Sequence, residues 1–401
     1  MTLNEPIIKR TWAEINLNNL SHNLLQIKKI IDESKTSIMC VVKANAYGHD
    51  DINLAHHLEV CGIKYFAVSN VYEAIHLRTN GIKGDILILG PTQMDQLKLI
   101  EKYDIIQTIP SIEYATSLLK EIDDKMRFRV HLAIDTGMCR IGERTKEHDD
   151  EKPLELVRLV KNSKCLEIDG LFTHYSCADS NEVDDEIFTK VQTDLFFDFC
   201  KKIEKIYGPI RHKHCLNSAG TIWHYDDRST LARIGIALYG ISPNENMTLP
   251  FELKPVMSVK STIQQIKMIS ANEYVGYGRT YLTKKETKIA IISIGYADGL
   301  PRALSSKGHV IINDKKIPII GRICMDTMMV DITNIDDIST DSTVTIIGEE
   351  KTCKITATEL ANLCNTIPYE IVCSLSNRVP RHIMLDNINV KVENYYIRGG
   401  Q

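Results

Sequence analysis

Lys43 is the residue whose position most directly indicates chemistry. It follows residues 38–42, a short apolar run rich in β-branched side chains, typical of a strand buried on both faces. An ammonium group at the inner end of a buried strand is costly unless it has a chemical use. The alternative, usual for a lone lysine, is a side chain that snorkels out of the strand end. Small and polar residues follow, and Lys43 is therefore a candidate reactive group.

Two later segments have the composition of phosphate-binding loops. Residues 216–220 (Leu-Asn-Ser-Ala-Gly) offer a hydroxyl and flexible backbone, and residues 233–236 (Arg-Ile-Gly-Ile) lie in the eighth apolar run. In a barrel, the loops after the seventh and eighth strands are the usual place for a phosphate. Either segment alone is equally consistent with a simple turn.

Residues 41–49, Val-Val-Lys-Ala-Asn-Ala-Tyr-Gly-His, closely resemble the pyridoxal phosphate attachment site of the alanine racemase family. The resemblance implies that Lys43 forms the Schiff base with pyridoxal 5'-phosphate and that Tyr47 lies beside the phosphate. Both later segments match the family's phosphate-binding loops. The residues that the resemblance implies for cofactor binding are Lys43, Tyr47, His174, Asn217, Ser218, Arg233, Gly235, Ile236 and Asn377.

Arg233 is implied to face the pyridine nitrogen of the cofactor. Because a guanidinium does not deprotonate in proteins, it keeps that nitrogen unprotonated. The ring is then a weak electron sink, which favours return of a proton to Cα over transamination. Without the resemblance, an arginine at a strand end would more simply be part of a surface ion pair.

Racemisation requires one base on each face of a planar intermediate. The resemblance implies Lys43 for one face and Tyr277, in residues 273–281, for the other. A tyrosine has a pKa of about 10, so its charge must be stabilised at neutral pH. The family supplies a histidine, here His174, which bonds the tyrosine and links it to Arg233. In this family the two bases meet across a homodimer interface, so that each active site is built from two chains.

The resemblance also implies the residues that bind a small amino-acid substrate. Arg140 contacts the substrate carboxylate and the cofactor hydroxyl, the Met325 backbone amide binds that carboxylate from the partner chain, and Tyr296 lines the entry channel. One position departs from the family pattern, because Ala133 replaces a lysine that is often carbamylated and that orients the arginine. We expect chloride, water or another carboxylate to substitute for it beside Arg140.

A second departure concerns the substrate. Typical alanine racemases have tyrosine where this chain has Asn377, and here the chain resembles serine racemases linked to glycopeptide resistance. Asparagine is smaller and can both donate and accept a hydrogen bond, so we expect turnover of serine as well as alanine. The alternatives are a broad-specificity racemase, a decarboxylase on the same scaffold and a non-catalytic pyridoxal phosphate carrier. A racemase would supply D-amino acid for cell-wall precursors.

The elements that must position these residues form two patterns. Eight apolar runs alternate with segments of helical periodicity, which predicts a (β/α)₈ barrel over residues 1–243 in preference to an open doubly wound sheet. Residues 244–401 predict a mostly β domain with one helix at 356–365 and a hairpin that turns at Asn313-Asp314. The first twelve residues or so are expected to pair with that β domain. The eight runs are residues 38–43, 65–69, 85–90, 105–109, 127–135, 168–174, 212–218 and 231–240.

Composition narrows the class of protein. The chain has 401 residues, 43% hydrophobic, and a formal charge of -4, which gives no electrostatic footprint for nucleic acid. No apolar run approaches the roughly 20 residues of a membrane span, and residues 1–10 lack the pattern of an export signal. The eleven cysteines lack Cys-x-x-Cys spacing, and the pair His212 and His214 lacks a third ligand, so we expect a cytoplasmic enzyme without a metal.

Overall fold

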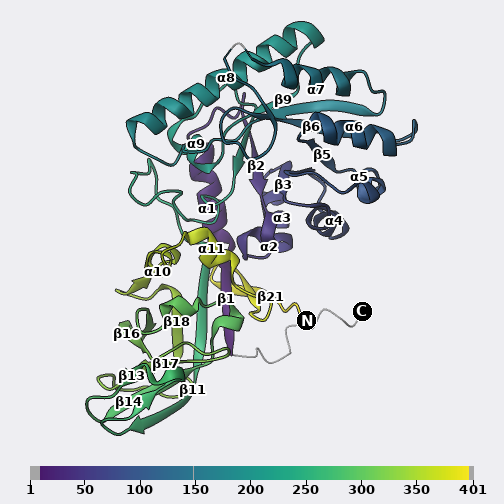
Figure 1. The fold of residues 1–401 in the computed structure, drawn as a ribbon. Helices are drawn as coiled ribbons and strands as arrows, with labels where there is room; N and C mark the ends of the chain where they lie inside the picture. Colours follow the sequence, from purple (N-terminus) through teal and green to yellow (C-terminus); the bar gives the residue numbers. More distant parts are fainter. Residues whose placement is uncertain (1–9, 148, 397–401) are drawn as a thin grey trace. The chain divides into compact units, whose positions relative to one another are not determined.

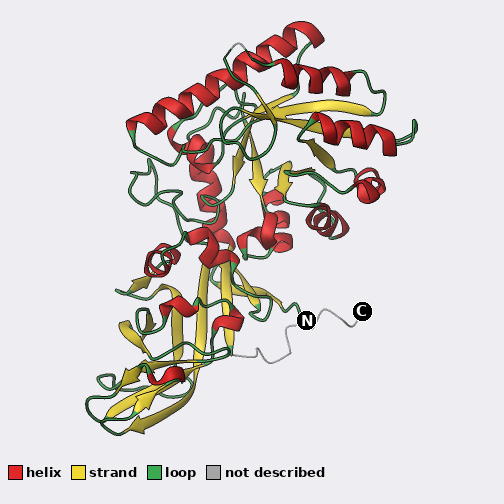
Figure 2. Ribbon diagram, in the orientation of Figure 1, coloured by secondary structure: helices red, strands yellow, loops and turns green. Residues whose placement is uncertain are grey.

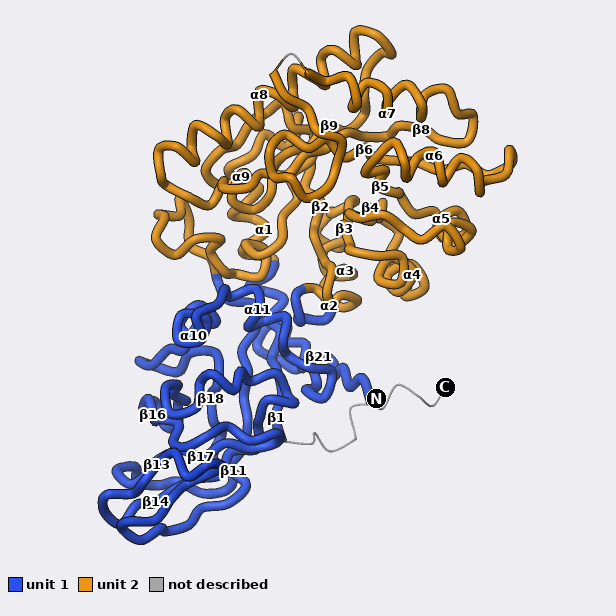
Figure 3. Tube along the Cα trace, in the orientation of Figure 1, with its two compact units in different colours: residues 1–20, 47–50, 254–401 blue, residues 21–46, 51–253 orange. Residues whose placement is uncertain are grey.

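The computed structural model describes residues 10–147 and 149–396, which form two compact units (Figure 3). The first comprises residues 21–46 and 51–253 and is called here the barrel unit. The second comprises residues 1–20, 47–50 and 254–401 and is called the β unit. Of the N-terminal segment expected to pair with the β domain, residues 1–9 lie outside the described residues.

Eight parallel strands form the core of the barrel unit (Figure 1). They follow one another in the order β10-β2-β3-β4-β5-β6-β8-β9. Backbone hydrogen bonds from Thr230 to Lys213 (2.8 Å) and from Arg233 to Leu216 (3.0 Å) join the two ends of this order. The sheet therefore closes, the predicted barrel is confirmed, and the open sheet is wrong. The strands are β2 (Ser37–Val41), β3 (Tyr65–Val68), β4 (Asp85–Ile88), β5 (Ile106–Ile109), β6 (Phe128–Asp135), β8 (Leu166–Phe172), β9 (His212–His214) and β10 (Leu231–Ile234).

Helices alternate with these strands along the chain and lie around the sheet (Figure 2). Many start at a side-chain cap; the Asn70 side chain, for example, accepts hydrogen bonds from the amides of Tyr72 and Glu73. None of the helices in residues 10–147 and 149–396 has the length and apolar character needed to cross a bilayer. The helices are α1 (Leu17–Lys28), α2 (Lys43–Tyr47), α3 (Asp51–Val60), α4 (Val71–Thr79), α5 (Leu97–Lys102), α6 (Ile112–Glu121), α7 (Glu151–Lys161), α8 (Val183–Tyr207) and α9 (Ser218–Trp223).

The β unit is built on a ten-stranded sheet in the order β19-β18-β15-β16-β17-β14-β11-β1-β20-β21. Its strand β1 (Thr11–Asn16) comes from the start of the chain and pairs with both β11 and β20. The mostly β character of this part is thus confirmed. The other strands of this sheet are β11 (Met257–Ile269), β14 (Thr287–Ile292), β15 (His309–Ile312), β16 (Lys315–Ile320), β17 (Met328–Asp331), β18 (Thr343–Glu349), β19 (Lys354–Ile355), β20 (Arg381–Leu385) and β21 (Ile388–Glu393).

Two local predictions for the β unit have different outcomes. The hairpin of β15 and β16 turns at Asn313 and Asp314, which both have positive φ (50° and 58°), as the predicted turn requires. The prediction of one helix is wrong, because α11 (Pro368–Cys373) follows the expected helix α10 (Ala357–Cys364). With six residues and a proline in its first turn, α11 is too short to show helical periodicity in the sequence.

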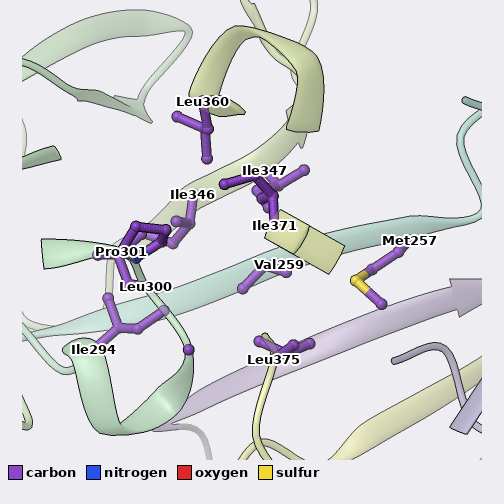
Figure 4. Close-up of a pocket in the computed structure, with 11 residues that line it drawn as sticks. Met257, Val259, Ile294, Leu300, Pro301, Ile346, Ile347, Leu360, Ile371 and Leu375 are labelled. Atoms are coloured by element: carbon purple, nitrogen blue, oxygen red, sulfur yellow. The ribbon is translucent and has the colours of Figure 1, made fainter. Parts of the chain in front are cut away.

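Apolar side chains fill the interior of the β unit (Figure 4). The space that they leave is about 10 Å³, room for one water at most. Leu375, two residues before Asn377, packs against this interior. The side chains around the space are those of Met257, Val259, Ile294, Leu300, Pro301, Ile346, Ile347, Leu360, Ile371 and Leu375.

Candidate active site

Lys43 stands where strand β2 ends and an unusual turn begins. The next residues, 44–47, have φ between 51° and 54°, which is a left-handed helical turn without glycine. Such a conformation costs about 1–2 kcal/mol per residue and persists only where the surroundings hold it. Here the Ala46 amide donates to the Val42 carbonyl (2.9 Å) and the Ala44 amide donates to Glu73 Oε1 (2.8 Å). Strain retained directly after Lys43 marks this segment as a candidate functional site.

Glu73 is a residue of this site that the sequence analysis missed. Its second oxygen, Oε2, accepts a hydrogen bond from the Ser69 amide (2.7 Å), so that one carboxylate ties the end of β3 to the turn after Lys43. Nearby, Asn45 Oδ1 accepts from the Asp51 amide (2.9 Å) at the start of α3. In the sequence, Glu73 is only an acidic residue in the first turn of a capped helix. Such residues are common because they interact favourably with the helix dipole, so this one did not indicate a functional site.

Arg233, in β10, is buried (3% exposed) and held at both terminal nitrogens. Nη1 donates to His214 Nδ1 (2.8 Å) and to the His214 carbonyl (3.0 Å). Nη2 donates to the carbonyls of Thr173 (2.8 Å) and Cys215 (3.2 Å) and to His174 Nδ1 (3.1 Å). Among the residues that the structure describes, the Nε–H has no acceptor. Burial lowers the Arg233 pKa to about 10, so the guanidinium remains charged at neutral pH.

His174 follows β8 and has the contact with Arg233 that the sequence analysis predicted. Burial, followed by the positive charges of Arg233, Arg140 and Lys43, holds the pKa of His174 well below its usual range. Arg233, Arg140 and Lys43 therefore each lie within electrostatic reach of His174 in the barrel unit. Since a guanidinium can only donate, His174 Nδ1 is the acceptor, and the proton of the neutral ring is on Nε2.

The two predicted phosphate-binding segments lie together. Ser218 Oγ accepts a hydrogen bond from the Gly235 amide (3.0 Å), which joins the loop after β9 to the end of β10. Asn217 Oδ1 accepts from the Gly220 amide (2.8 Å) and caps the short helix α9. Ile236 is buried (1% exposed) directly after Gly235. The fold thus collects a hydroxyl, an amide side chain and backbone N–H groups at one place.

Arg140 is exposed in the loop that follows β6, and Ala133 is buried in that strand. The Asp135 carboxylate accepts from the amides of Gly137 (2.9 Å) and Cys139 (3.0 Å) and thereby shapes the loop. No carboxylate within residues 10–147 and 149–396 forms an ion pair with Arg140.

Tyr277, Tyr296 and Met325 lie on the β unit and are exposed by 69%, 43% and 52%. Tyr277 begins a single 3₁₀ turn (Tyr277–Arg279) between β12 (Tyr274–Val275) and β13 (Tyr281–Leu282). Both flanking residues are glycines with positive φ, 76° for Gly276 and 71° for Gly278. L side chains rarely adopt this conformation, so the presentation of Tyr277 favours glycine on both sides.

A mostly apolar pocket of about 440 Å³ lies beside Tyr277 on the β unit. Its base is the buried cluster of Val275, Ile289, Ile320 and Met329. An exposed tyrosine next to an apolar hollow is a surface that suits a second chain. The lining residues are Lys267, Ile269, Tyr274, Val275, Gly276, Tyr277, Ile289, Ile291, Cys324, Thr327 and Met329.

Arg381 organises the remaining predicted residues, Tyr47 and Asn377, and was also missed. Its Nε and Nη2 donate to the Gly48 carbonyl (3.1 and 2.9 Å), directly after Tyr47. Its Nη1 donates to the Ser376 carbonyl (2.7 Å), directly before Asn377. Tyr47 is buried, which raises the pKa of its hydroxyl, whereas Asn377 is exposed in a turn.

The barrel unit meets the requirements of a phosphorylated cofactor with an aldehyde and a ring nitrogen. It offers an amine on a strained turn, paired loops for a phosphate, and an otherwise satisfied arginine with one unmatched N–H group. The fold and this site define an enzyme of the class that carries pyridoxal 5'-phosphate on a (β/α)₈ barrel followed by a β domain.

Comparison with known proteins identifies the family. Residues 15–243 match the family model "Alanine racemase, N-terminal domain", and residues 256–383 match "Alanine racemase, C-terminal domain". The chain belongs to the alanine racemase family, whose cofactor is pyridoxal 5'-phosphate.

Similar proteins match over nearly the whole chain. The alanine racemase of Halothermothrix orenii is 39% identical over 94% of this chain and 98% of its own length, and that of Clostridium tetani is 38% identical over 97% and 99%. The crystal structure of Bacillus anthracis alanine racemase with bound L-Ala-P has a TM-score of 0.91 and 33% identity, covering 98% of this chain and 99% of that one. Alanine racemase of Clostridium difficile has a TM-score of 0.90 and 35% identity, covering 97% and 100%.

Proposed function

We propose that this chain is an isomerase that interconverts L- and D-alanine, with pyridoxal 5'-phosphate bound covalently to Lys43. The observation that carries the proposal is the grouping of Lys43, Arg140 and Arg233 around His174, which accepts a hydrogen bond from Arg233. A base, a carboxylate-binding cation, a neutral histidine and a fixed guanidinium are the groups that proton transfer at an amino-acid Cα requires. The D-amino acid formed would serve cell-wall precursors.

Each part of the cofactor has residues suited to hold it. Arg233 offers its Nε–H to the pyridine nitrogen, and its charge keeps that nitrogen unprotonated. Lys43 provides the amine. When bound, pyridoxal phosphate delocalises the electron pair that remains on the substrate Cα after its proton is removed. The residues proposed for the phosphate are Tyr47, Asn217, Ser218, Gly235 and Ile236.

Two bases on opposite faces of Cα explain racemisation. Lys43 moves the proton on one face, and the partner subunit's Tyr277 moves it on the other. Because Arg233 donates to His174 Nδ1, His174 presents its Nε2–H to the tyrosine oxygen and stabilises the phenolate. The 69% exposure of Tyr277 and the apolar pocket beside it support a homodimer with shared sites.

The substrate is held by Arg140 at its carboxylate, together with the partner subunit's Met325 amide, while Tyr296 lines the entry. We further propose that serine is a substrate, because Asn377 leaves space and supplies both a donor and an acceptor for a hydroxymethyl group. The hydrogen bonds of Arg381 to Gly48 and Ser376 give this position a fixed backbone. A fixed polar group discriminates between substrates better than a mobile one.

Exchange of the α-proton in deuterated water, followed by proton NMR, tests the function. We expect exchange and racemisation with L-alanine and with L-serine when pyridoxal phosphate is present. Exchange with alanine alone would contradict the serine assignment, and exchange with neither amino acid would contradict the proposed function.

Substitutions at Asn377 separate space from hydrogen bonding. Asn377→Tyr is expected to lower the serine-to-alanine ratio of kcat/KM by about tenfold or more, since such contacts are worth about 1–3 kcal/mol. Asn377→Ala keeps the space and removes the amide, and it should lower the ratio as well if the hydrogen bond is responsible. An unchanged ratio in Asn377→Tyr would show that this position does not select the substrate.

A further inference from the structure

Four hydrogen-bonded side chains form a row through the interior of the barrel unit, from Arg233 to Asp169. Arg233 Nη1 lies 2.8 Å from His214 Nδ1, and His214 Nε2 lies 2.8 Å from His131 Nδ1. His131 Nε2 in turn lies 3.4 Å from Asp169 Oδ2. The four residues come from four different strands, β10, β9, β6 and β8. The proposed two-base reaction uses Arg233 and leaves the other three without a role.

The direction of every hydrogen bond in this row follows from its arginine. A guanidinium has no lone pair to accept with, so His214 Nδ1 must be the acceptor and Nε2 carries the proton. That proton makes His131 Nδ1 an acceptor in the same way, which puts the His131 proton on Nε2, facing the Asp169 carboxylate. Burial lowers the pKa of both imidazoles, consistent with neutral rings. All donors in the row therefore point toward Asp169.

The row connects two opposite charges that are both removed from water. Arg233 and Asp169 are each 3% exposed, and the two histidines between them are fully buried. Burial alone would raise the Asp169 pKa, but the hydrogen bond from His131 and the charge of Arg211, whose Nη1 lies 3.2 Å from Asp169 Oδ1, lower it to about 2. A buried guanidinium without a compensating anion is strongly destabilised. The hydrogen bonds of the row connect Arg233 to such an anion, the Asp169 carboxylate.

We propose that Asp169 is a positioning residue for Arg233, acting through His131 and His214. Arg233 sets the direction of the hydrogen bonds from one end of the row, and the Asp169 carboxylate, which can only accept, holds the same direction from the other end. His214 therefore keeps an acceptor facing Arg233 Nη1 whenever their contact opens. Held in this way, Arg233 keeps its Nε–H available for the ring nitrogen of the cofactor. The inference rests on the proposed function, since it assigns a reason for holding that guanidinium in place.

His212, which lies in β9 together with His214, provides a matched control for substitutions in the row. It is buried, its Nε2 lies 4.0 Å from Asp169 Oδ2, and its ring packs edge-on against Tyr65 at 5.2 Å between centroids. It is nevertheless outside the row, because neither of its ring nitrogens forms a hydrogen bond. The substitution His212→Gln thus disturbs the neighbourhood of Asp169 and leaves the row intact.

The first test reads the protons directly. The full chain, labelled with nitrogen-15 in its histidine rings, is observed by NMR with and without pyridoxal phosphate. We expect His131 and His214 to be neutral with the proton on Nε2 in both samples. A proton on Nδ1 of His214, or a cationic ring at either position at neutral pH, would overturn the proposal. This test needs no substitution and holds even if a variant fails to fold.

The second test separates positioning from stability. Asp169→Leu removes the acceptor, and we expect kcat for alanine to fall about tenfold, the effect of losing one charge-assisted hydrogen bond, with KM unchanged. His214 should then also show a mixture of tautomers. Asp169→Asn keeps an acceptor oxygen and should retain more than half of kcat, as should His212→Gln. A kcat in Asp169→Leu equal to that of His212→Gln, per site loaded with cofactor, would overturn the proposal.

The two levels of the proposal fail in different ways. If the unsubstituted protein exchanges the α-proton of neither alanine nor serine, the proposed function fails, and the NMR test still reports on the row. If it racemises alanine and Asp169→Leu does so at the same kcat with an unchanged His214 tautomer, only the positioning role fails.

Discussion

The barrel unit and the β unit hold their functional side chains in opposite ways. In the barrel unit, Arg233 is 3% exposed and has hydrogen-bond partners at both terminal nitrogens. In the β unit, Tyr277 stands 69% exposed on a glycine-flanked turn, and the side chains around the small interior space of Figure 4 are apolar. The difference teaches that the barrel sets the properties of its reactive groups with its own neighbours. The β unit presents Tyr277 at its surface, so the properties of this side chain depend on the molecule that covers it.

The largest effect is expected in the barrel unit, from Lys43→Ala. This change removes the group that binds the cofactor and one of the two bases, so racemisation of alanine should fall by about 10⁴-fold or more. The α-proton exchange assay measures the loss, and the absorption of dialysed protein reports retained cofactor. Lys83→Ala, at an exposed lysine of the same unit, is the control. Activity of Lys43→Ala within tenfold of the control would remove Lys43 from the mechanism.

In the β unit, Tyr277→Phe removes the hydroxyl that is proposed as the second base. It should lower racemisation by about 10³-fold, the contribution of one base. Because Lys43 still serves its own face, one alanine enantiomer should continue to exchange its α-proton without inversion. Proton NMR in deuterated water distinguishes exchange from inversion.

The neighbouring exposed tyrosine supplies the control for this change. Tyr274→Phe, on the same hairpin, should behave as the unsubstituted protein does. Equal loss of exchange for both enantiomers in Tyr277→Phe would contradict a two-base reaction.

Arg381→Leu is expected to destabilise the β unit by about 3 kcal/mol, because it leaves buried carbonyls such as those of Gly48 and Leu375 without donors. The protein has two tryptophans, and Trp12 belongs to the β unit. Urea unfolding followed by Trp12 fluorescence in a Trp223→Phe background measures the change.

Arg378→Leu is the matched control. It loses a partly exposed ion pair with Asp326 (2.8 Å) and a longer one with Asp298 (3.7 Å), which Arg10 continues to pair with (2.8 Å), so it should cost less than about 1 kcal/mol. If both substitutions had the same small effect, the hydrogen bonds of Arg381 would not be what holds the backbone around Tyr47 and Asn377.

The last comparison concerns the pH dependence of stability in the two units. Burial lowers the pKa of His131 and His214, so the native barrel unit keeps them neutral while the unfolded chain takes up protons below a pH of about 6.5. The free energy of unfolding therefore contains their full contribution above that pH. It falls as the pH falls, by about 1.4 kcal/mol per histidine at one pH unit below that value. Urea unfolding at pH 7 and 5.5, followed by Trp223 in a Trp12→Phe background, measures this loss.

The same unfolding measurement on the β unit, followed by Trp12 fluorescence, provides the comparison. Burial lowers the pKa of His382 there, but the barrel unit combines several such histidines, so its unfolding midpoint should fall further. Equal shifts at the two probes would show that the buried histidines of the barrel do not govern its acid sensitivity.

The barrel was predictable because most of its strands, being buried on both faces, are apolar runs that are visible in the sequence, although β9 is His-Lys-His. The contact between His174 and Arg233 was also expected and is present. The left-handed turn after Lys43 was not, because residues such as Ala44 and Ala46 have no preference for that conformation. Glu73 imposes it from a different helix, and sequence spacing does not reveal such a contact.

The row from Arg233 to Asp169 shows the same limit. The sequence indicated that His212 and His214 share one face of a strand, and that they lack a third metal ligand. It did not indicate that His214 pairs with His131, 83 residues earlier, because the two lie on β9 and β6, on either side of β8, and inward-facing side chains of alternate barrel strands meet only in the folded layer. Arg381 is similar, since its acceptors are backbone carbonyls, which any residue possesses.

The most direct test of the division between the two units is complementation between two inactive variants. Lys43→Ala and Tyr277→Phe chains, each with a different affinity tag, are co-expressed and the mixed dimers are purified through both tags. If each site combines the barrel of one chain with the partner subunit's Tyr277, a mixed dimer has one intact site of two and should recover about half of the normal racemase activity. Mixed dimers as inactive as either parent would contradict the shared site and place both bases within one chain.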